Sequence, residues 1–224
     1  MVDLMVESGV PARTWSGGEE VVLLRELCHR AGNDCAVALS ALRLVGHKSM
    51  AKAGERSRLV QQVTARLEAS AELHRLLARP ISVRIEAGAW LAAVCLAAAA
   101  AGPQHGGRVQ LDVPEMWLDG TLARRLGMVA AELVANAVKY AAGADLSVTV
   151  RAALGGVRLL IVDRGPGIVP GSRAQGRGLG SGIVADLVAL GGGRLSIETG
   201  PAGTTVSVEM PTDAPGALGR GAGR

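Results

Sequence analysis

The stretch from residue 132 to residue 140 constrains the fold more than any other part of the chain. Two or three apolar residues separate its polar ones, which is the spacing of a helix with one buried face. Glu132, Asn136 and Tyr140 follow one another at intervals of four and share one side of that helix, with Lys139 beside them. A carboxylate, an amide and an ammonium group in one row could bind a metal ion and a polyphosphate. Such rows are more often a solvated helix face, so the residues that follow decide between the two interpretations.

Three glycine-containing motifs follow this helix in order. Asp163, Gly165 and Gly167 form D-x-G-x-G directly after a strand-like run over residues 157–162. Residues 176–182 (G-R-G-L-G-S-G) open a helical pattern, and a G-T-T triplet at residues 203–205 precedes an alternating strand. Glycine lets a backbone approach a ligand closely, and amides at a helix N-terminus bind phosphate. Each motif is weak by itself, but four of them in this order form a strong signal.

The order E-x-x-x-N-x-x-K, D-x-G-x-G, G-x-G, G-T-T resembles the ATP-binding domain of histidine kinases and of the wider gyrase, chaperone, kinase and MutL ATPase group. The resemblance covers about residues 19–211 and implies ATP as the ligand, with Mg²⁺. At the adenine end it implies that Asp163 accepts a hydrogen bond from the base. Gly165 and Gly167 would let the backbone pass the base, and Thr204 and Thr205 would close this end of the site.

At the phosphate end the resemblance implies that Asn136 offers an amide oxygen to Mg²⁺ and that Lys139 approaches the phosphates. Glu132 would orient the waters of the metal or help to accept a proton. Tyr140 belongs to the same set and stands where many members of the group carry histidine. The phosphates would also lie against the backbone amides of Gly178, Gly180 and Ser181.

The first third of the chain predicts two long amphipathic helices. Apolar residues recur at helical spacing over residues 24–45 and again over residues 59–77, and Pro80 ends the second run. A single hairpin cannot bury both apolar stripes, so a second copy is expected to complete a four-helix bundle. The predicted organisation is a lead-in (1–18), a dimerisation and histidine phosphotransfer hairpin (19–79), a catalytic ATP-binding domain (80–211) and a disordered tail (212–224).

The first of these helices carries E-x-x-H-R-x-x-N, with Glu26, His29 and Asn33 at helical spacing. This resembles the phosphoacceptor box of one histidine-kinase subfamily, which carries H-R-x-x-N where most kinases carry H-E. The resemblance implies that His29 attacks the γ-phosphate of ATP, while Glu26 or Asn33 selects the imidazole tautomer. The competing interpretation is a surface histidine with a local hydrogen bond. The other candidate acceptors are His47, His74 and His105.

The second part of the chain predicts helices over residues 84–101, 122–142 and 183–190. Strands are expected over residues 108–113, 146–151, 157–162, 195–198 and 205–210, and residues 114–119 are expected to form a connector. Helices on one side of a mixed, mostly antiparallel sheet make a two-layer α/β sandwich. The overall class is therefore α+β, with a helical hairpin preceding the sandwich.

Composition excludes several other classes of protein. Hydrophobic residues make up 49% of the 224 residues, so the chain is not disordered. The net charge is +4, but aromatic side chains that could stack on bases make up only 2% of the chain, which disfavours nucleic-acid binding.

The longest apolar run, residues 87–102, is shorter than the ~20 residues of a membrane span, and no signal peptide is apparent. The odd number of cysteines (Cys28, Cys35 and Cys95) indicates reduced thiols in a cytoplasmic protein.

These features predict a soluble two-component histidine kinase that forms a homodimer and passes its phosphoryl group to an aspartate of a response-regulator receiver domain. Fewer than 20 residues precede the first predicted helix, below the ~50 residues of a small domain, so input is expected from an upstream sensor or phosphodonor protein. Two alternatives remain open. One is a histidine phosphotransferase whose kinase-like domain does not turn over ATP. The other is an anti-sigma-factor serine kinase.

Overall fold

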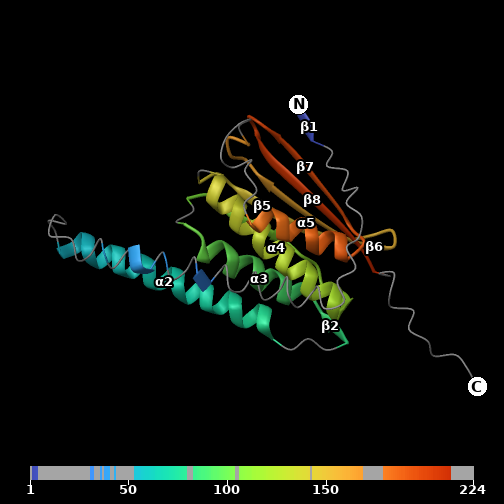
Figure 1. Ribbon diagram of the computed structural model, residues 1–224, viewed down its shortest axis with the longest axis horizontal. Coiled ribbons are helices and arrows are strands. Elements are labelled where there is room, and N and C mark those ends of the chain that lie inside the picture. The colour runs from blue at the N-terminus through green and yellow to red at the C-terminus, as the bar shows by residue number, and fades with distance from the viewer. Residues whose placement is uncertain are drawn as a thin grey trace, which may run out of the picture.

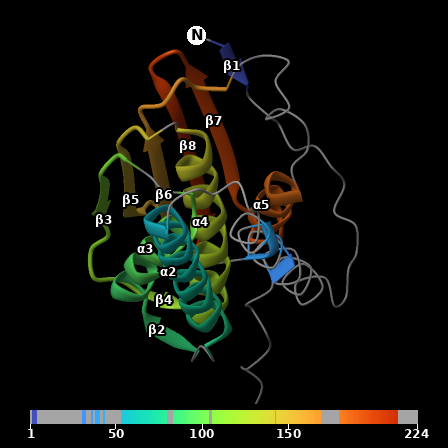
Figure 2. The same ribbon diagram turned by 90° about the vertical axis from the view of Figure 1, so that its left-hand side faces the viewer.

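The computed structural model describes residues 2–4, 31–32, 36, 38–40, 43, 53–79, 83–103, 106–141, 143–168 and 179–212. A six-stranded sheet forms one layer and helices cover one of its faces (Figures 1 and 2). The strands are β1 (Val2–Leu4), β2 (Arg84–Glu86), β3 (Val109–Asp112), β4 (Trp117–Asp119), β5 (Leu146–Ala153), β6 (Gly156–Asp163), β7 (Arg194–Gly200) and β8 (Gly203–Pro211). The helices are α2 (Ala53–Ala78), α3 (Gly88–Ala101), α4 (Gly120–Tyr140) and α5 (Leu179–Leu190).

The large sheet has the strand order β1-β7-β8-β6-β5-β3. Its β3–β5 pair is parallel and its other pairs are antiparallel, which confirms the expected mixed sheet. The β5–β6 hairpin turns at Leu154 and Gly155, one residue before the turn that the Gly155-Gly156 pair predicts, because Gly156 already pairs with Ala153; its register sets Asp163 opposite Leu146. Strand β1 lies within the predicted lead-in and adds an edge strand beside β7.

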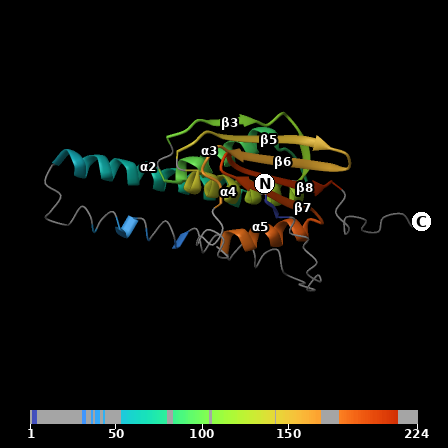
Figure 3. The ribbon, with the colours of Figure 1, turned by 90° about the horizontal axis from the view of Figure 1, so that it is seen from above.

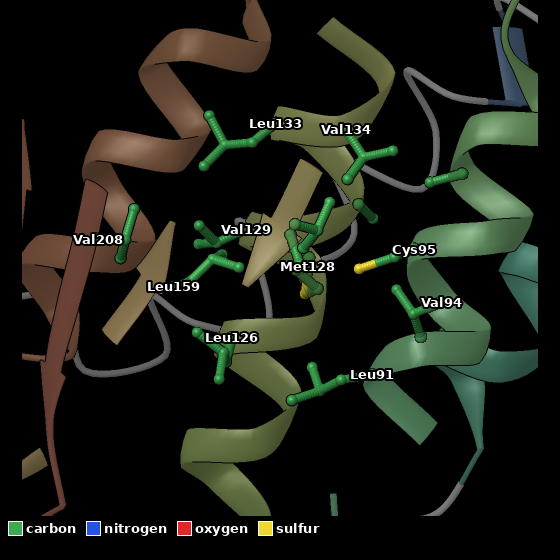
Figure 4. Close-up of a cluster of buried hydrophobic side chains, with 14 of the residues drawn as sticks. Leu91, Val94, Cys95, Leu126, Met128, Val129, Leu133, Val134, Leu159 and Val208 are labelled. Carbon is green, nitrogen blue, oxygen red and sulfur yellow. The ribbon is translucent and has the colours of Figure 1, made fainter. Parts of the chain in front are cut away.

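Helix α4 lies at the centre of the core. Its apolar face is buried almost along its full length, because apolar residues recur at helical spacing from Leu122 to Val138. Figure 4 shows Leu126, Val129 and Leu133 of α4 between residues of the sheet and residues of α3. Seen from above, the sheet and the helices form two layers (Figure 3). The α+β class and the two-layer sandwich are thus confirmed.

Helix α3 is buried against α4, as the alanine-rich run predicted. It holds Cys95, a free thiol whose burial raises its pKa to about 12, so this thiol stays protonated and unreactive at neutral pH. Among the described residues, no helix is both long and apolar enough to cross a membrane.

The C-terminal half of α2 shares this core. Leu73 and Leu77 are buried with the side chains of α3 and α4, whereas the first turns of α2 are exposed and extend beyond the sandwich (Figure 1). Trp90 of α3 connects the three helices. Its Nε1 donates a hydrogen bond to the Leu76 carbonyl oxygen at 3.2 Å, and its ring occupies the space that a Cβ at Gly127 of α4 would need. The domain boundary near residue 80 stays a prediction. The described residues of the first predicted helix (31–32, 36, 38–40 and 43) are helical.

The expectation of an uninterrupted helix over residues 84–101 is wrong, as is that of a plain connector over residues 114–119. Residues of both segments pair as the β2–β4 ribbon, in which Ile85 faces Leu118. The helix begins only at Gly88, because the Glu86 carboxylate accepts hydrogen bonds from the amides of Gly88 (2.7 Å) and Ala89 (3.2 Å). Desolvation raises the pKa of Glu86, but these two bonds and a third from the Met116 amide outweigh it, and the pKa lies below its usual value.

Candidate functional site

The predicted polar row lies on the last turns of α4. Asn136 Nδ2 donates a hydrogen bond to Glu132 Oε1 at 3.3 Å. An ionised carboxylate only accepts hydrogen bonds, so the nitrogen end of the amide must face Glu132. This leaves Asn136 Oδ1, a neutral oxygen donor for a hard cation, without a hydrogen bond to any described residue.

Lys139 and Tyr140 end the helix, and both side chains are exposed. Lys139 Nζ lies 4.9 Å from the centroid of the Tyr140 ring, within the range of a cation–π contact. The ammonium group is therefore held at the end of α4 by its neighbour while remaining open to solvent. Carboxylate, amide and ammonium thus lie along two turns of one helix, as the spacing predicted.

Asp163 ends β6 and begins the loop that follows it. Its Oδ1 accepts a hydrogen bond from the Gly165 amide at 2.9 Å. A Cβ at Gly165 would lie only 2.6 Å from Ala141 Cα, the residue directly after α4. The loop therefore packs against the end of α4, and only glycine permits this approach. The structure brings the D-x-G-x-G motif next to the polar row of α4.

The G-T-T triplet forms the other wall of this loop. Thr204 faces Asp163 in the β6–β8 register and faces Thr199 in the β7–β8 register. Successive strand residues point to opposite sides of a sheet, so Thr205 lies on the open side, away from Asp163. The structure thus brings Thr204, but not Thr205, to the cluster around Asp163.

The sequence analysis did not include Thr199 among the site residues. Its hydroxyl oxygen accepts a hydrogen bond from the Ile168 amide at 2.8 Å and lies 3.3 Å from Thr204 Oγ1. The sequence feature that could have predicted its position is the Gly-Pro-Ala-Gly turn at residues 200–203. This turn makes a tight hairpin and sets Thr199 opposite Thr204.

The glycine-rich stretch is described from residue 179. Gly180 and Ser181 lie in the first turn of α5, where backbone amides are free to bind an anion. The other predicted site residues, Gly178, His29 and Asn33, lie outside the described residues, as do His47 and His105. His74 is described, and its Nε2 is buried without a hydrogen-bond partner in the described structure, so that nitrogen is not accessible to a nucleotide. No group of three or more His, Cys, Asp or Glu side chains within the described ranges could hold a metal ion.

The sequence matches a known family over its C-terminal part. Residues 121–214 match the family described as histidine kinase-, DNA gyrase B-, and HSP90-like ATPase. The match contains α4, the D-x-G-x-G loop and the G-T-T strand, which are the elements that meet in the site.

Curated proteins that are similar to part of this chain include sensor kinases. The sensor protein kinase CarS of Pseudomonas aeruginosa is 39% identical over 102 residues, which cover 39% of this chain and 23% of CarS. The histidine protein kinase DivJ of Caulobacter vibrioides is 33% identical over 132 residues, covering 46% of this chain and 22% of DivJ. This chain therefore spans less than a quarter of the length of these relatives.

Two solved structures share the fold over most of this chain. The histidine kinase domain of a blue-light activated histidine kinase from Erythrobacter litoralis superposes with a TM-score of 0.55 and 24% identity, over 80% of this chain and 94% of that one. A bacterial phosphotransferase superposes with a TM-score of 0.61 and 12% identity, over 89% of this chain and 99% of that one. At these identities the comparison establishes the fold alone. Since a kinase domain and a phosphotransferase both have this fold, the site residues must separate the two functions.

Proposed function

We propose that this chain binds ATP with Mg²⁺ and is the catalytic core of a two-component histidine kinase. One observation carries the proposal: Gly165 packs on Ala141, which joins the Asp163 loop to the end of α4 that carries Asn136 and Lys139. A carboxylate suited to an adenine amino group therefore lies beside an amide oxygen and an ammonium group suited to a metal-bound triphosphate.

The donor set fits Mg²⁺. This ion takes oxygen ligands and is usually bound through one or two protein groups together with substrate phosphates. Asn136 Oδ1 would be such a ligand, and the hydrogen bond from Asn136 Nδ2 to Glu132 fixes the orientation of the amide. When bound, Mg²⁺ supplies positive charge that offsets the charge of the phosphates. Lys139 adds a second positive charge, and the first turn of α5 adds backbone amides.

The phosphoryl acceptor in this proposal is His29, with Asn33 and Glu26 holding its tautomer. An imidazole nitrogen bonds to the γ-phosphorus while the bond to the leaving oxygen breaks and ADP is released. Such a transfer depends mainly on positioning and on stabilisation of charge. The phosphoryl group then passes to an aspartate of a receiver domain.

A specific observation keeps the second candidate, a histidine phosphotransferase that does not turn over ATP. The bacterial phosphotransferase has the same fold over almost its full length. The intact set of Asn136, Lys139 and Asp163 favours the kinase, since a protein that does not use ATP has no need of these groups. The anti-sigma-factor serine kinase remains the third candidate, and the H-R-x-x-N box argues against it.

Asp163→Asn tests the nucleotide site. We expect ADP and ATP to bind about 10- to 150-fold more weakly, or roughly 1.5–3 kcal/mol, because the variant loses a charged hydrogen-bond acceptor for the base. Isothermal titration calorimetry with Mg²⁺ measures the affinity. Asp112→Asn is the matched control: this exposed aspartate lies on the edge strand β3, which β5 separates from the Asp163 strand β6, and its loss should leave the affinity unchanged.

Two outcomes would count against the proposal. Equal affinity of the wild type and Asp163→Asn would remove Asp163 from the site. A wild-type protein that binds no nucleotide would instead favour the phosphotransferase.

We also expect a homodimer through residues 19–79. The N-terminal half of α2 exposes apolar surface, including Val60 at 47% exposure, where it extends beyond the sandwich. Burying such a stripe in a bundle provides the driving force for association. Multi-angle light scattering at micromolar concentration should give twice the mass of 22.8 kDa. A monomer at high micromolar concentration contradicts this expectation.

A further inference from the structure

We propose that Thr199 is a positioning residue that holds the adenine side of the nucleotide site in its binding conformation. The inference rests on the proposed ATP-binding function and extends it to a residue that none of the motifs contains. Thr199 lies one residue before the end of β7, and its partner across the hairpin is Thr204.

The hydroxyl of Thr199 joins two segments of the chain. It accepts a hydrogen bond from the Ile168 amide at 2.8 Å and lies 3.3 Å from Thr204 Oγ1. A hydroxyl has one donor and two acceptor positions, so one oxygen can make both contacts. The first contact holds the loop that begins at Asp163, and the second holds the strand residue that faces Asp163.

The packing around this hydroxyl leaves the loop little freedom to adopt another position. Gly167 has φ +72°, and a Cβ there would overlap the Gly200 carbonyl oxygen, so the loop lies directly on the β7–β8 turn. The amide of the next residue, Ile168, is partly buried and has Thr199 Oγ1 as its acceptor. Without that oxygen the amide must seek water, which moves the loop away from the turn.

Thr199 therefore acts on the nucleotide through the loop. Its hydrogen bonds are made to Ile168 and Thr204, whereas Lys139 lies at the end of α4 and contacts the Tyr140 ring. Loss of the hydroxyl should weaken binding of the base and leave the phosphoryl-transfer step unchanged.

The test uses Thr199→Val, which removes the hydroxyl but keeps the shape and the strand preference of the side chain. We expect ADP with Mg²⁺ to bind about 3- to 15-fold more weakly by calorimetry, the range for a lost hydrogen bond. Thr199→Ser, which keeps the hydroxyl, should bind ADP within about twofold of the wild type. Thr149→Val on β5, a strand hydroxyl on the open side of the sheet, is the matched control and should bind ADP as the wild type does.

A kinetic measurement distinguishes a positioning role of Thr199 from a general loss of folded structure in the variant. In Thr199→Val the KM for ATP in autophosphorylation should rise by the same factor as the Kd for ADP, while the rate at saturating ATP stays that of the wild type. Equal ADP affinity of wild type and Thr199→Val overturns the proposal. So does a Thr199→Ser variant as weak as Thr199→Val, because the serine keeps the hydroxyl and a hydroxyl at this position would then not be enough to maintain binding.

Hydrogen exchange of the nucleotide-free protein distinguishes failure of this inference from failure of the proposed function. The Ile168 amide should exchange faster in Thr199→Val than in the wild type and in Thr149→Val. If the wild type binds no ADP, the proposed function fails. Faster exchange at Ile168 in Thr199→Val would then still show that the Thr199 hydroxyl keeps the loop in position. Unchanged exchange at Ile168 contradicts this role of Thr199, whether or not ADP binds.

Discussion

Replacing His29 with alanine abolishes labelling of the protein by γ-labelled ATP in the presence of Mg²⁺. This expected result follows from the proposed acceptor role, since no other group in the H-R-x-x-N box offers an uncharged nitrogen nucleophile at neutral pH. The wild-type label should be lost in acid and retained in base, as expected for phosphohistidine. Affinity for ADP should be unchanged in His29→Ala, because Asp163, Asn136 and Lys139 remain in place.

The same experiment separates the candidate functions. A phosphotransferase takes no label from ATP but accepts it at His29 from a phosphorylated receiver domain. A serine kinase labels a separate protein with an acid-stable product and is indifferent to His29→Ala. His74→Ala is the matched control, because the Nε2 of His74 is buried, and this variant should keep its label. An acid-labile label that persists in His29→Ala would assign the phosphoacceptor to another histidine.

The parts of the fold that could be predicted are those where one local pattern is strong. Helix α4 repeats its apolar residues at helical spacing over almost five turns, and the β5–β6 hairpin has alternating strands around a turn that contains Gly155. Strands β2 and β4 could not be predicted in this way. Each has three residues, and the burial of Ile85 and Leu118 depends on their pairing with each other. Three residues are too few to establish a period of two.

The same distinction between local pattern and tertiary packing applies to the residues of the candidate site. The row of Glu132, Asn136 and Lys139 is set by helical geometry, so its alignment followed from the sequence. Its proximity to Asp163 depends on the packing of Gly165 against Ala141, which no spacing encodes. Thr199 was missed for a related reason, because its importance comes from the residue opposite it in a hairpin.

Trp90→Ala should lower the free energy of unfolding by about 3–5 kcal/mol, the usual cost of truncating a buried tryptophan. Trp90 is 9% exposed, its ring fills the space above Gly127, and its Nε1 hydrogen bond to Leu76 joins α3 to α2. The substitution leaves a cavity among three helices and removes a donor to the last turns of α2. Urea denaturation followed by circular dichroism measures the change.

The matched control is the same substitution at Trp117, which is 57% exposed on β4 and should cost no more than about 1 kcal/mol. Comparison of the two variants separates the loss of packing from the loss of a tryptophan as such. Trp90→Ala should also affect the contact between the end of α2 and the helices of the sandwich. Because Trp90 connects the end of α2 to α4, Trp90→Ala should also raise hydrogen exchange in the last turns of α2, over residues 70–78, more than in the β5–β6 hairpin. Equal costs at Trp90 and Trp117, or exchange that rises uniformly, would show that Trp90 does not hold this contact.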